Sequence, residues 1–163
     1  MSLTISEEKP EITKFLTTNQ LGTLATADKE GQPHTAAVYF TIDPDLNIYF
    51  ITKDQTTKAR NIAENSKVAF AVYEAASQKT VQVQGTAAAI DDPSRADDIF
   101  RRILAITAST SESRIPPISK LSAGGYGLYK ITPDVMRMAS FTKPEHGQPN
   151  DIFDAVVKPD ATL

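Results

Sequence analysis

The chain has 163 residues, enough for one domain with a buried core, and it has no cysteine, which excludes disulfides, thiol nucleophiles and iron–sulfur clusters. A formal charge of −3 with no basic stripe argues against a nucleic-acid partner, and two histidines make a histidine-built zinc site improbable. No apolar run approaches the roughly 20 residues that span a bilayer, and the N-terminus lacks a signal peptide's apolar core, so we expect no membrane partner and a cytoplasmic location.

The first part of the chain predicts a helix, three strands and a second helix. The opening helix includes residues 13–18 and carries Ile12, Phe15 and Leu16 on one side. Residues 28–31 form a turn in which Gly31 is free to take a positive φ, and residues 43–47 form another. The predicted strands are 21–27, 33–42 and 48–52, and the second helix spans about 56–64.

The second part predicts more strands around a third helix. Ser94 is the expected N-cap of that helix, with Asp97 at the third position of a capping box. A polar linker over 109–117 follows, and then a closing hairpin around Thr132-Pro133-Asp134. Short antiparallel strands closed by hairpins favour a small barrel. The predicted strands are 68–73, 81–90, 126–131 and 135–141.

The connection from the third strand to the second helix carries the clearest chemistry. Two hydroxyls, a lysine and the unpaired amide groups of a helix start suit a phosphate ester. Lys58 lies in the first helical turn, where a cation opposes the helix dipole unless an anion is bound. The alternatives are a solvated lysine and a threonine, Thr56 or Thr57, that only caps the helix.

Four segments together resemble the flavin-binding core of the pyridoxamine 5′-phosphate oxidase-like split-barrel family. They read LGTLATADKEGQPHTAAVYF, IYFIT, TTKARNIAEN and VQVQGTAAAI, and they lie between Leu21 and Ile90. The resemblance implies a mainly β (β+α) fold, a six-stranded antiparallel split β-barrel with a few peripheral helices. It also implies a single FMN-binding domain over 1–141, followed by a tail, 142–163, that packs on a partner subunit.

The resemblance also implies which residues bind the cofactor. Lys58 corresponds to the lysine that pairs with the flavin phosphate, and the supporting donors are Thr52, Lys53, Thr56 and Thr57. The strand around Val38 corresponds to the one that lies along the isoalloxazine ring, and Thr80 to a polar residue that approaches the flavin. No catalytic residue is assigned, and His34 and His146 are expected at the surface. The implied cofactor-binding residues are Ala36, Ala37, Val38, Tyr39, Thr52, Lys53, Thr57, Lys58, Thr80 and Gln82.

Three positions depart from the family pattern. Many oxidases of the family carry arginine where this chain has Thr57, and Arg60 is expected to point elsewhere. Ala36 and Thr41 occupy the two strand positions at which the pyridoxamine oxidases proper carry basic residues. These departures weaken an assignment to vitamin B6 oxidation.

The resemblance implies an FMN-dependent oxidoreductase that acts on a small-molecule substrate. It implies a homodimer with one FMN at each of two subunit interfaces, and Met136, Met138 and Phe141 are candidates for the subunit contact. One alternative is a deazaflavin-dependent reductase on the same fold. Another is a non-catalytic protein that stores or senses flavin or haem.

Overall fold

Apolar residues at every second position give each strand one face for a shared interior. In the computed structural model, which describes residues 5–108, 125–141 and 153–157, alternate side chains are buried along most strands. The elements are α1 (Ile5–Thr18), β1 (Leu21–Ala27), β2 (Pro33–Ile42), β3 (Ile48–Lys53), α2 (Thr57–Glu64), β4 (Lys67–Glu74), β5 (Lys79–Ile90), α3 (Pro93–Ala108), β6 (Tyr126–Ser140) and β7 (Phe153–Val157).

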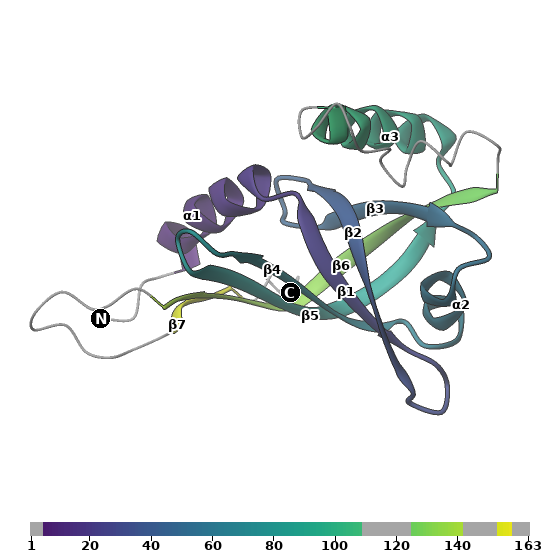
Figure 1. Ribbon diagram of the computed structural model, residues 1–163, viewed down its shortest axis with the longest axis horizontal. Helices are drawn as coiled ribbons and strands as arrows, with labels where there is room; N and C mark the ends of the chain where they lie inside the picture. The colour runs from purple at the N-terminus through teal and green to yellow at the C-terminus, as the bar shows by residue number, and fades with distance from the viewer. Residues whose placement is uncertain (1–4, 109–124, 142–152, 158–163) are drawn as a thin grey trace, which may run out of the picture.

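The strands pair antiparallel in the order β3-β2-β1-β4-β5-β6-β7, and β3 also pairs with β6. That last pairing closes β1 to β6 into a barrel, while β7 adds to the edge of β6 (Figure 1). The predicted six-stranded antiparallel barrel with a few helices is confirmed. The extent of the domain and the packing of the tail on a partner stay predictions; within the chain, 153–157 pairs with β6.

The barrel interior is an apolar core closed at one end by α1. Phe40 and Phe70 meet there edge to face, with ring centroids 5.0 Å apart. The helix α1 adds Ile12, Phe15 and Leu16 to this core, as the sequence predicted. Among the described residues, none of the helices has the length and apolarity needed to cross a membrane.

The helix α3 lies outside the barrel against β2 and β3 (Figure 1). Ile99 and Ile103 belong to a second apolar cluster there, which includes Tyr49 of β3. Polar contacts fix the start of the helix. Arg95 Nη2 donates to Tyr49 Oη at 2.7 Å, and this hydroxyl donates to Asp43 Oδ2 at 2.9 Å.

The two predicted turns of the first half are confirmed, because both depend on local chemistry. Gly31 has φ +88°, and Asp28 Oδ1 accepts from the amides of Glu30 and Gln32 at 2.9 Å each. In the other turn, Asp43 Oδ1 accepts from the amide of Asn47 at 3.0 Å.

The predicted closing hairpin is wrong, because β6 runs unbroken through Thr132-Pro133-Asp134. Both halves of β6 pair with the same long strand, β5, and the register shifts between Gln84 and Gly85. Gly85 pairs with Pro133 and Gln84 with Val135, so one residue of β6 is extra. A bulge is one of the few places where a sheet tolerates proline, which has no N–H to donate.

Two further predictions fail. Asp92, not Ser94, caps α3: its Oδ1 accepts from the amide of Arg95 at 3.0 Å, and Pro93 takes the first helical position. Met136 and Met138 point into the barrel core and are not available for a subunit contact.

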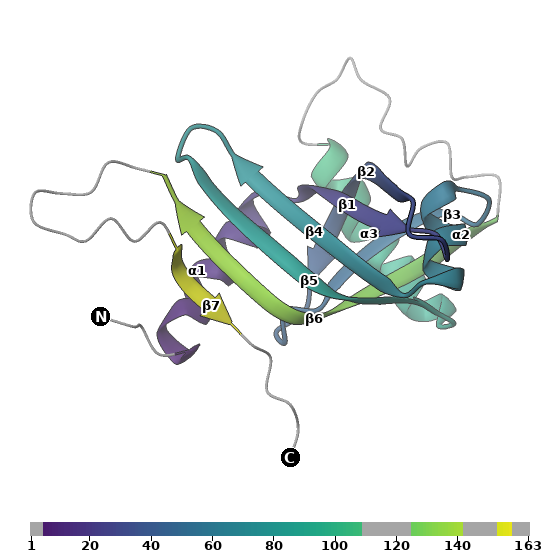
Figure 2. The same ribbon diagram turned by 90° about the horizontal axis from the view of Figure 1, so that it is seen from below.

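One broad face of the sheet, the outer side of β1, β4, β5 and β6, is covered by none of the helices that the structure describes (Figure 2). We call it the open sheet face. Its side chains are small or polar, and exposed apolar residues lie at one end: Leu21 is 51% exposed and Tyr73 60% exposed. The register aligns Thr23, Ala71, Gln82 and Arg137 in one row across it.

The bulge gives a test of the corrected β6. A Cβ added at Gly85 would meet the carbonyl oxygen of Thr132, which is backbone and cannot rotate away. We expect Gly85→Ala to lower the free energy of unfolding by about 1–3 kcal/mol, as overpacking does. Urea denaturation measures this. Gln84→Ala, one residue away and exposed, is the control and should change it by less than about 0.5 kcal/mol; equal effects would contradict this register.

Candidate cofactor site

The two strands that lead to the candidate site separate early. The pairing of β2 with β3 covers only Phe40 to Ile42 against Ile48 to Phe50. Beyond that, β3 continues to Lys53 along β6, and β2 continues to Pro33 along β1. Among the described residues, the facing edges of 33–39 and 51–53 therefore have no strand partner.

The direction of the backbone groups follows from one hydrogen bond. Phe40 N–H donates to the carbonyl of Gln20, at the start of β1, at 3.1 Å. Since backbone groups alternate sides along a strand, the N–H and C=O groups of Ala37 and Tyr39 point to the open side. Backbone groups that are buried or half-buried require hydrogen-bond partners. The open edge of β2 is therefore suited to bind the polar rim of a ligand.

The residues predicted to contact the ring differ in the direction and burial of their side chains. Val38 is buried in the barrel, whereas Ala37 is exposed on the outer side. Ala36 is half-buried on the inner side, and Tyr39 packs against the α3 cluster. A flat ligand beside Ala37 would thus meet a small side chain, with Tyr39 at one end.

The turn from β3 to α2 brings the predicted threonines together. Thr56 is the N-cap of α2: its Oγ1 accepts from Ala59 N at 3.4 Å and lies 3.3 Å from Thr52 Oγ1. Thr57 is half-buried at the first helical position, and Lys53 is exposed at the end of β3. The structure therefore places Thr52, Lys53, Thr57 and Lys58 around one helix start, beside the open strand edges.

Lys58 is half-buried in the first turn of α2. Burial lowers the pKa of its ammonium below the ordinary value of 10.5. The first turn of α2 contains no acidic residue, and among the described residues Lys58 makes no ion pair. A cation without an anion in this position is poorly stabilised, and a bound phosphate would stabilise it.

A buried hydrogen bond fixes α2 on the barrel. Asn61 Nδ2 donates to Thr26 Oγ1 of β1 at 3.0 Å, and both residues are almost fully buried. His34 lies opposite Thr26 in the register and so shares its side of the sheet. Contrary to the expectation of a surface residue, His34 is half-buried, and its Nδ1 is buried without a hydrogen bond in the described part of the chain. His146 lies outside the described residues.

Arg60 is a residue that the sequence analysis misjudged. Its guanidinium turns back along α2, and Nη2 donates to Thr57 Oγ1 at 3.4 Å. Thr57 and Arg60 are three residues apart, and residues with this spacing are neighbours on a helix surface. The spacing could therefore have predicted their contact. A guanidinium therefore lies beside Thr57, where many oxidases of the resembled family carry arginine.

Within one chain, Thr80 and Gln82 lie away from the residues at the start of α2 and the open edge of β2. Both lie on β5, three strands from β2, which corresponds to about 14 Å at the usual strand spacing. Thr80 Oγ1 donates to the carbonyl of Val72 at 2.9 Å, while Gln82 is exposed on the open sheet face.

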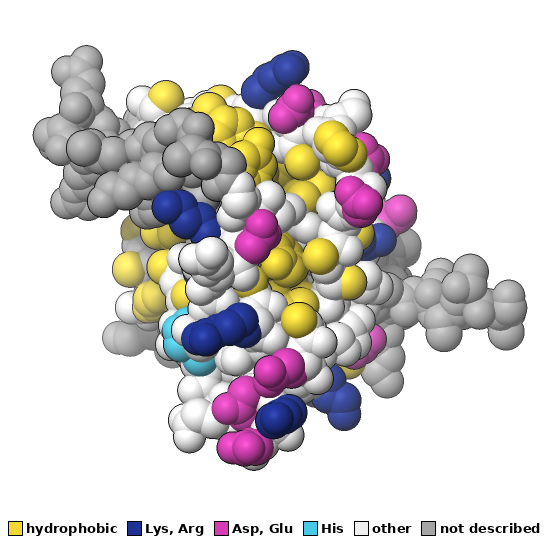
Figure 3. Space-filling view, turned by 90° about the vertical axis from the view of Figure 1, so that its right-hand side faces the viewer, with side chains coloured by type: hydrophobic (Ala, Val, Ile, Leu, Met, Phe, Trp, Pro, Cys, Tyr) yellow, Lys and Arg dark blue, Asp and Glu magenta, His cyan; other side chains and the backbone are white. Residues whose placement is uncertain are grey.

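The arrangement fits a ligand with a flat ring, hydrogen-bonding ring edges and a phosphate. Ala37 and the open backbone edge suit the ring, and the start of α2 suits the phosphate. Figure 3 looks at the end of the barrel that carries α2. On that face, basic side chains are scattered among acidic, polar and apolar ones.

The pyridoxamine 5′-phosphate oxidase family model matches residues 8–138. Because the match spans well over half of the chain, the protein belongs to this family.

Individual proteins are also similar to this chain in sequence or in fold. The chain is 33% identical over 105 residues to the 5a,11a-dehydrotetracycline/5a,11a-dehydrooxytetracycline reductase of Streptomyces rimosus subsp. rimosus, which covers 56% of this chain and 73% of the reductase. A conserved hypothetical protein of Mycobacterium tuberculosis shares the fold with TM-score 0.69 and 20% identity, over 87% of this chain and 92% of that one. A FAD-binding protein of Mesorhizobium loti does so with TM-score 0.62 and 24% identity, over 79% and 91%.

Proposed function

We propose that the protein is an FMN-dependent oxidoreductase acting on a small-molecule substrate. The observation that carries the proposal is the meeting of two unpaired strand edges with a half-buried, unpaired Lys58 at a helix start. The family, the reductase of Streptomyces rimosus and the FAD-binding protein of Mesorhizobium loti support a flavin-type cofactor and redox chemistry.

The start of α2 holds the cofactor phosphate in this proposal. Lys58 supplies the charge, and the free amides and the Thr57 hydroxyl supply directed donors. Arg60 lies close enough to Thr57 to add a second cation. Arg60 is our proposed replacement for the arginine that this chain lacks at position 57.

The open edge of β2 orients the ring. The backbone groups of Ala37 and Tyr39 meet its polar edge, and the small side chain of Ala37 permits close approach. A flavin accepts and returns a hydride, so the chain's own task is to bind, orient and shield it. No side chain of the described site forms a nucleophile–base pair, which agrees with redox chemistry that resides in the cofactor.

A deazaflavin is the second candidate cofactor. The same phosphate site and strand edge would hold it, and the similarity to a named reductase favours reduction of the substrate. The absorption spectrum and mass of the bound molecule distinguish the two. A protein that only stores flavin or haem would bind its ligand but would not pass electrons from a reduced flavin to any acceptor.

We further propose a homodimer that completes the site. Ala37 of β2 is exposed beside the open sheet face, and Gln82 is exposed within it, yet one chain keeps them three strands apart. If two open sheet faces pack together, Gln82 of one copy can reach the ring held by the other. Such an obligate interface would bury at least about 2,000 Å².

One prediction of this proposal concerns Lys58. We expect Lys58→Ala to weaken FMN binding by roughly ten- to a hundredfold, because a hydrogen bond to a charged group contributes roughly 1.5–3 kcal/mol. Riboflavin, which has no phosphate, should bind the variant almost as before. Flavin fluorescence quenching measures both affinities. Lys29→Ala, an exposed lysine in the β1–β2 turn, is the control; equal losses for FMN and riboflavin would remove Lys58 from the phosphate site.

Another prediction concerns the dimer. Light scattering at micromolar concentration should give twice the monomer mass of 17.7 kDa. Ala71→Glu places a charge in the middle of the open sheet face and should produce monomers that bind FMN weakly. Lys29→Glu, at an exposed turn, should leave the dimer intact. A monomeric wild-type protein that retains its flavin would contradict the shared site.

A further inference from the structure

His34 has one ring nitrogen inside the protein and the other near the surface. Its Nδ1 is buried and has no hydrogen-bond partner, and no other side-chain atom is in this state among the residues that the structure describes. The residue as a whole is only half-buried, so the outer edge of the ring with Nε2 lies at the surface. A buried polar atom without a partner is rare in a folded protein and needs an explanation.

The ring lies on the same side of the sheet as the contact that holds α2. In the register of β1 and β2, His34 is opposite Thr26. Thr26 Oγ1 accepts from Asn61 Nδ2 of α2 at 3.0 Å. Lys58 precedes Asn61 by three residues, so these two side chains are neighbours on the surface of α2. The imidazole and the Lys58 ammonium therefore lie at the same end of the barrel, where Figure 3 shows histidine beside a basic side chain.

The elements packed against His34 offer no free anion to a protonated ring. β1 contains no charged residue, and β2 contains none besides His34. The charged residues of the β1–β2 turn and of α2 are Asp28, Lys29, Glu30, Lys58, Arg60 and Glu64. All except Asp28 and Lys58 are exposed, and Asp28 Oδ1 already accepts two backbone amides. With the site empty, a charged imidazole would thus have the half-buried Lys58 ammonium as its neighbour, and like charges repel.

A phosphate at the start of α2 would reverse this balance. Its oxygens would accept from the Lys58 ammonium and from Nε2–H of the ring, and its negative charge would stabilise both cations. Ala36, the next residue on the same side of β2, has a small side chain that leaves the ring room to approach. Inside the barrel, the Thr26 hydroxyl accepts one hydrogen bond and has a second lone pair for a protonated Nδ1.

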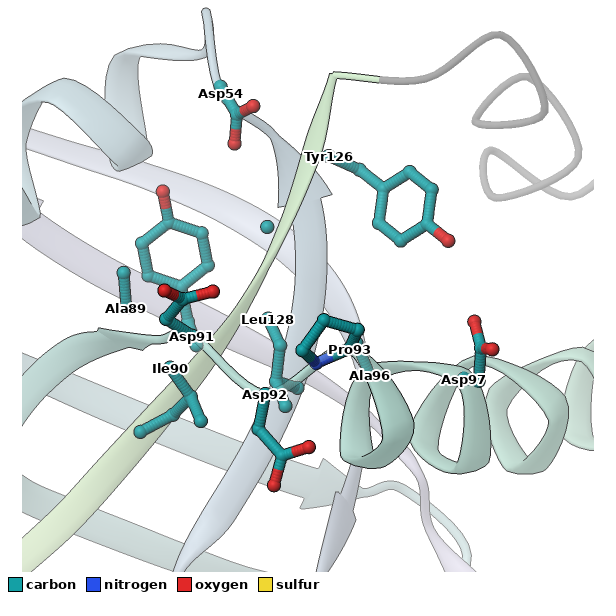
Figure 4. A pocket seen from close by; sticks show the side chains of 12 residues that line it. Asp54, Ala89, Ile90, Asp91, Asp92, Pro93, Ala96, Asp97, Tyr126 and Leu128 are labelled. Atoms are coloured by element: carbon teal, nitrogen blue, oxygen red, sulfur yellow. The ribbon is translucent and has the colours of Figure 1, made fainter.

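The hollow on the other side of β3 is unsuited to a phosphate. This cavity of about 440 Å³ lies beside the start of β6 and is lined by four carboxylates, those of Asp54, Asp91, Asp92 and Asp97 (Figure 4). No lysine or arginine of the described residues lines it. The negative potential there would repel an anion, which leaves the β2 side of α2 as the place for the phosphate.

We propose that His34 is a proton-dependent ligand of the cofactor phosphate. At neutral pH the ring is neutral when the site is empty, and it takes up one proton from water when the phosphate binds. The charged ring then donates from Nε2 to the phosphate and from Nδ1 to the Thr26 hydroxyl. This inference rests on the proposed function, since it needs the phosphate that Lys58 holds.

The pH dependence of flavin binding to the full chain tests the role of His34. A ligand that favours the charged ring binds more tightly as the pH falls through about 6.5, the region in which an imidazole titrates. We expect the ratio of FMN affinity to riboflavin affinity to rise by about three- to tenfold between about pH 8 and about pH 6. Flavin fluorescence quenching measures both affinities.

Two variants separate the charge of His34 from the titration of the ligand. The phosphate of FMN itself titrates near about pH 6, but it does so equally with every variant. His34→Gln keeps a neutral donor and should lose most of the rise in the affinity ratio. His34→Arg is charged at both pH values and should bind FMN tightly at both. Calorimetry in two buffers of different ionisation enthalpy should show that the wild type takes up more protons per FMN than His34→Gln.

A matched control moves the histidine by two residues. The double variant Gln32→His with His34→Gln has the same composition as the wild type, but its histidine lies at an exposed position of the turn. It should behave as His34→Gln does. Recovery of the pH dependence in this double variant would show general attraction to a nearby positive charge and would overturn the inference.

Two further results would contradict the inference in different ways. If Lys58→Ala weakens FMN binding but His34→Gln has the same pH dependence and proton uptake as the wild type, only the role of His34 is overturned. If FMN does not bind, or binds equally well without Lys58, the proposed function and the role of His34 are both overturned.

Discussion

The rest of the site depends on the short pairing between β2 and β3. Only three residue pairs join β2 to β3. The other edge of β3 pairs with β6 over the whole length of β3. The β3–β6 pairing closes the barrel, so β2 need not be paired over its whole length for stability. The open backbone edge at Ala37 and Tyr39 is a consequence of how the barrel closes, and it is formed from rigid elements.

The same closure positions the charged end of the site. Because β3 ends beside the open edge, the helix that follows it starts there, with Thr56 as its cap and Lys58 in its first turn. The buried bond between Asn61 and Thr26 then ties α2 to β1. A phosphate group would therefore meet donors that are already in place, and little conformational freedom would be lost on binding.

The sequence predicted the parts of this structure that depend on local chemistry. The turns at Gly31 and Asp43 follow from their own side chains, and the strand–turn–helix around Lys58 follows from alternation and capping. Pro133 was misread as a turn because its place in a bulge depends on β5, which lies about 50 residues earlier in the chain.

The other errors have related causes. Asp92 and Ser94 are both residue types that cap helices well. Asp92 is the cap because β5 ends just before it and Pro93 then takes the first helical position. The sequence alone did not place Met136 and Met138 on the inner face, which the pairing with Val83 and Val81 sets. The separation of Gln82 from β2 depends on the strand order, which no local pattern encodes.

Hydrogen exchange of the backbone amides, with and without flavin, tests the central claim most directly. With FMN, exchange should slow in two segments, residues 35–39 of β2 and residues 53–60 around the start of α2. Riboflavin should slow only the first segment, because it has no phosphate. If FMN slowed neither segment, or if the slowing lay only in elements remote from these two, the cofactor would not be held between the β2 edge and the α2 start.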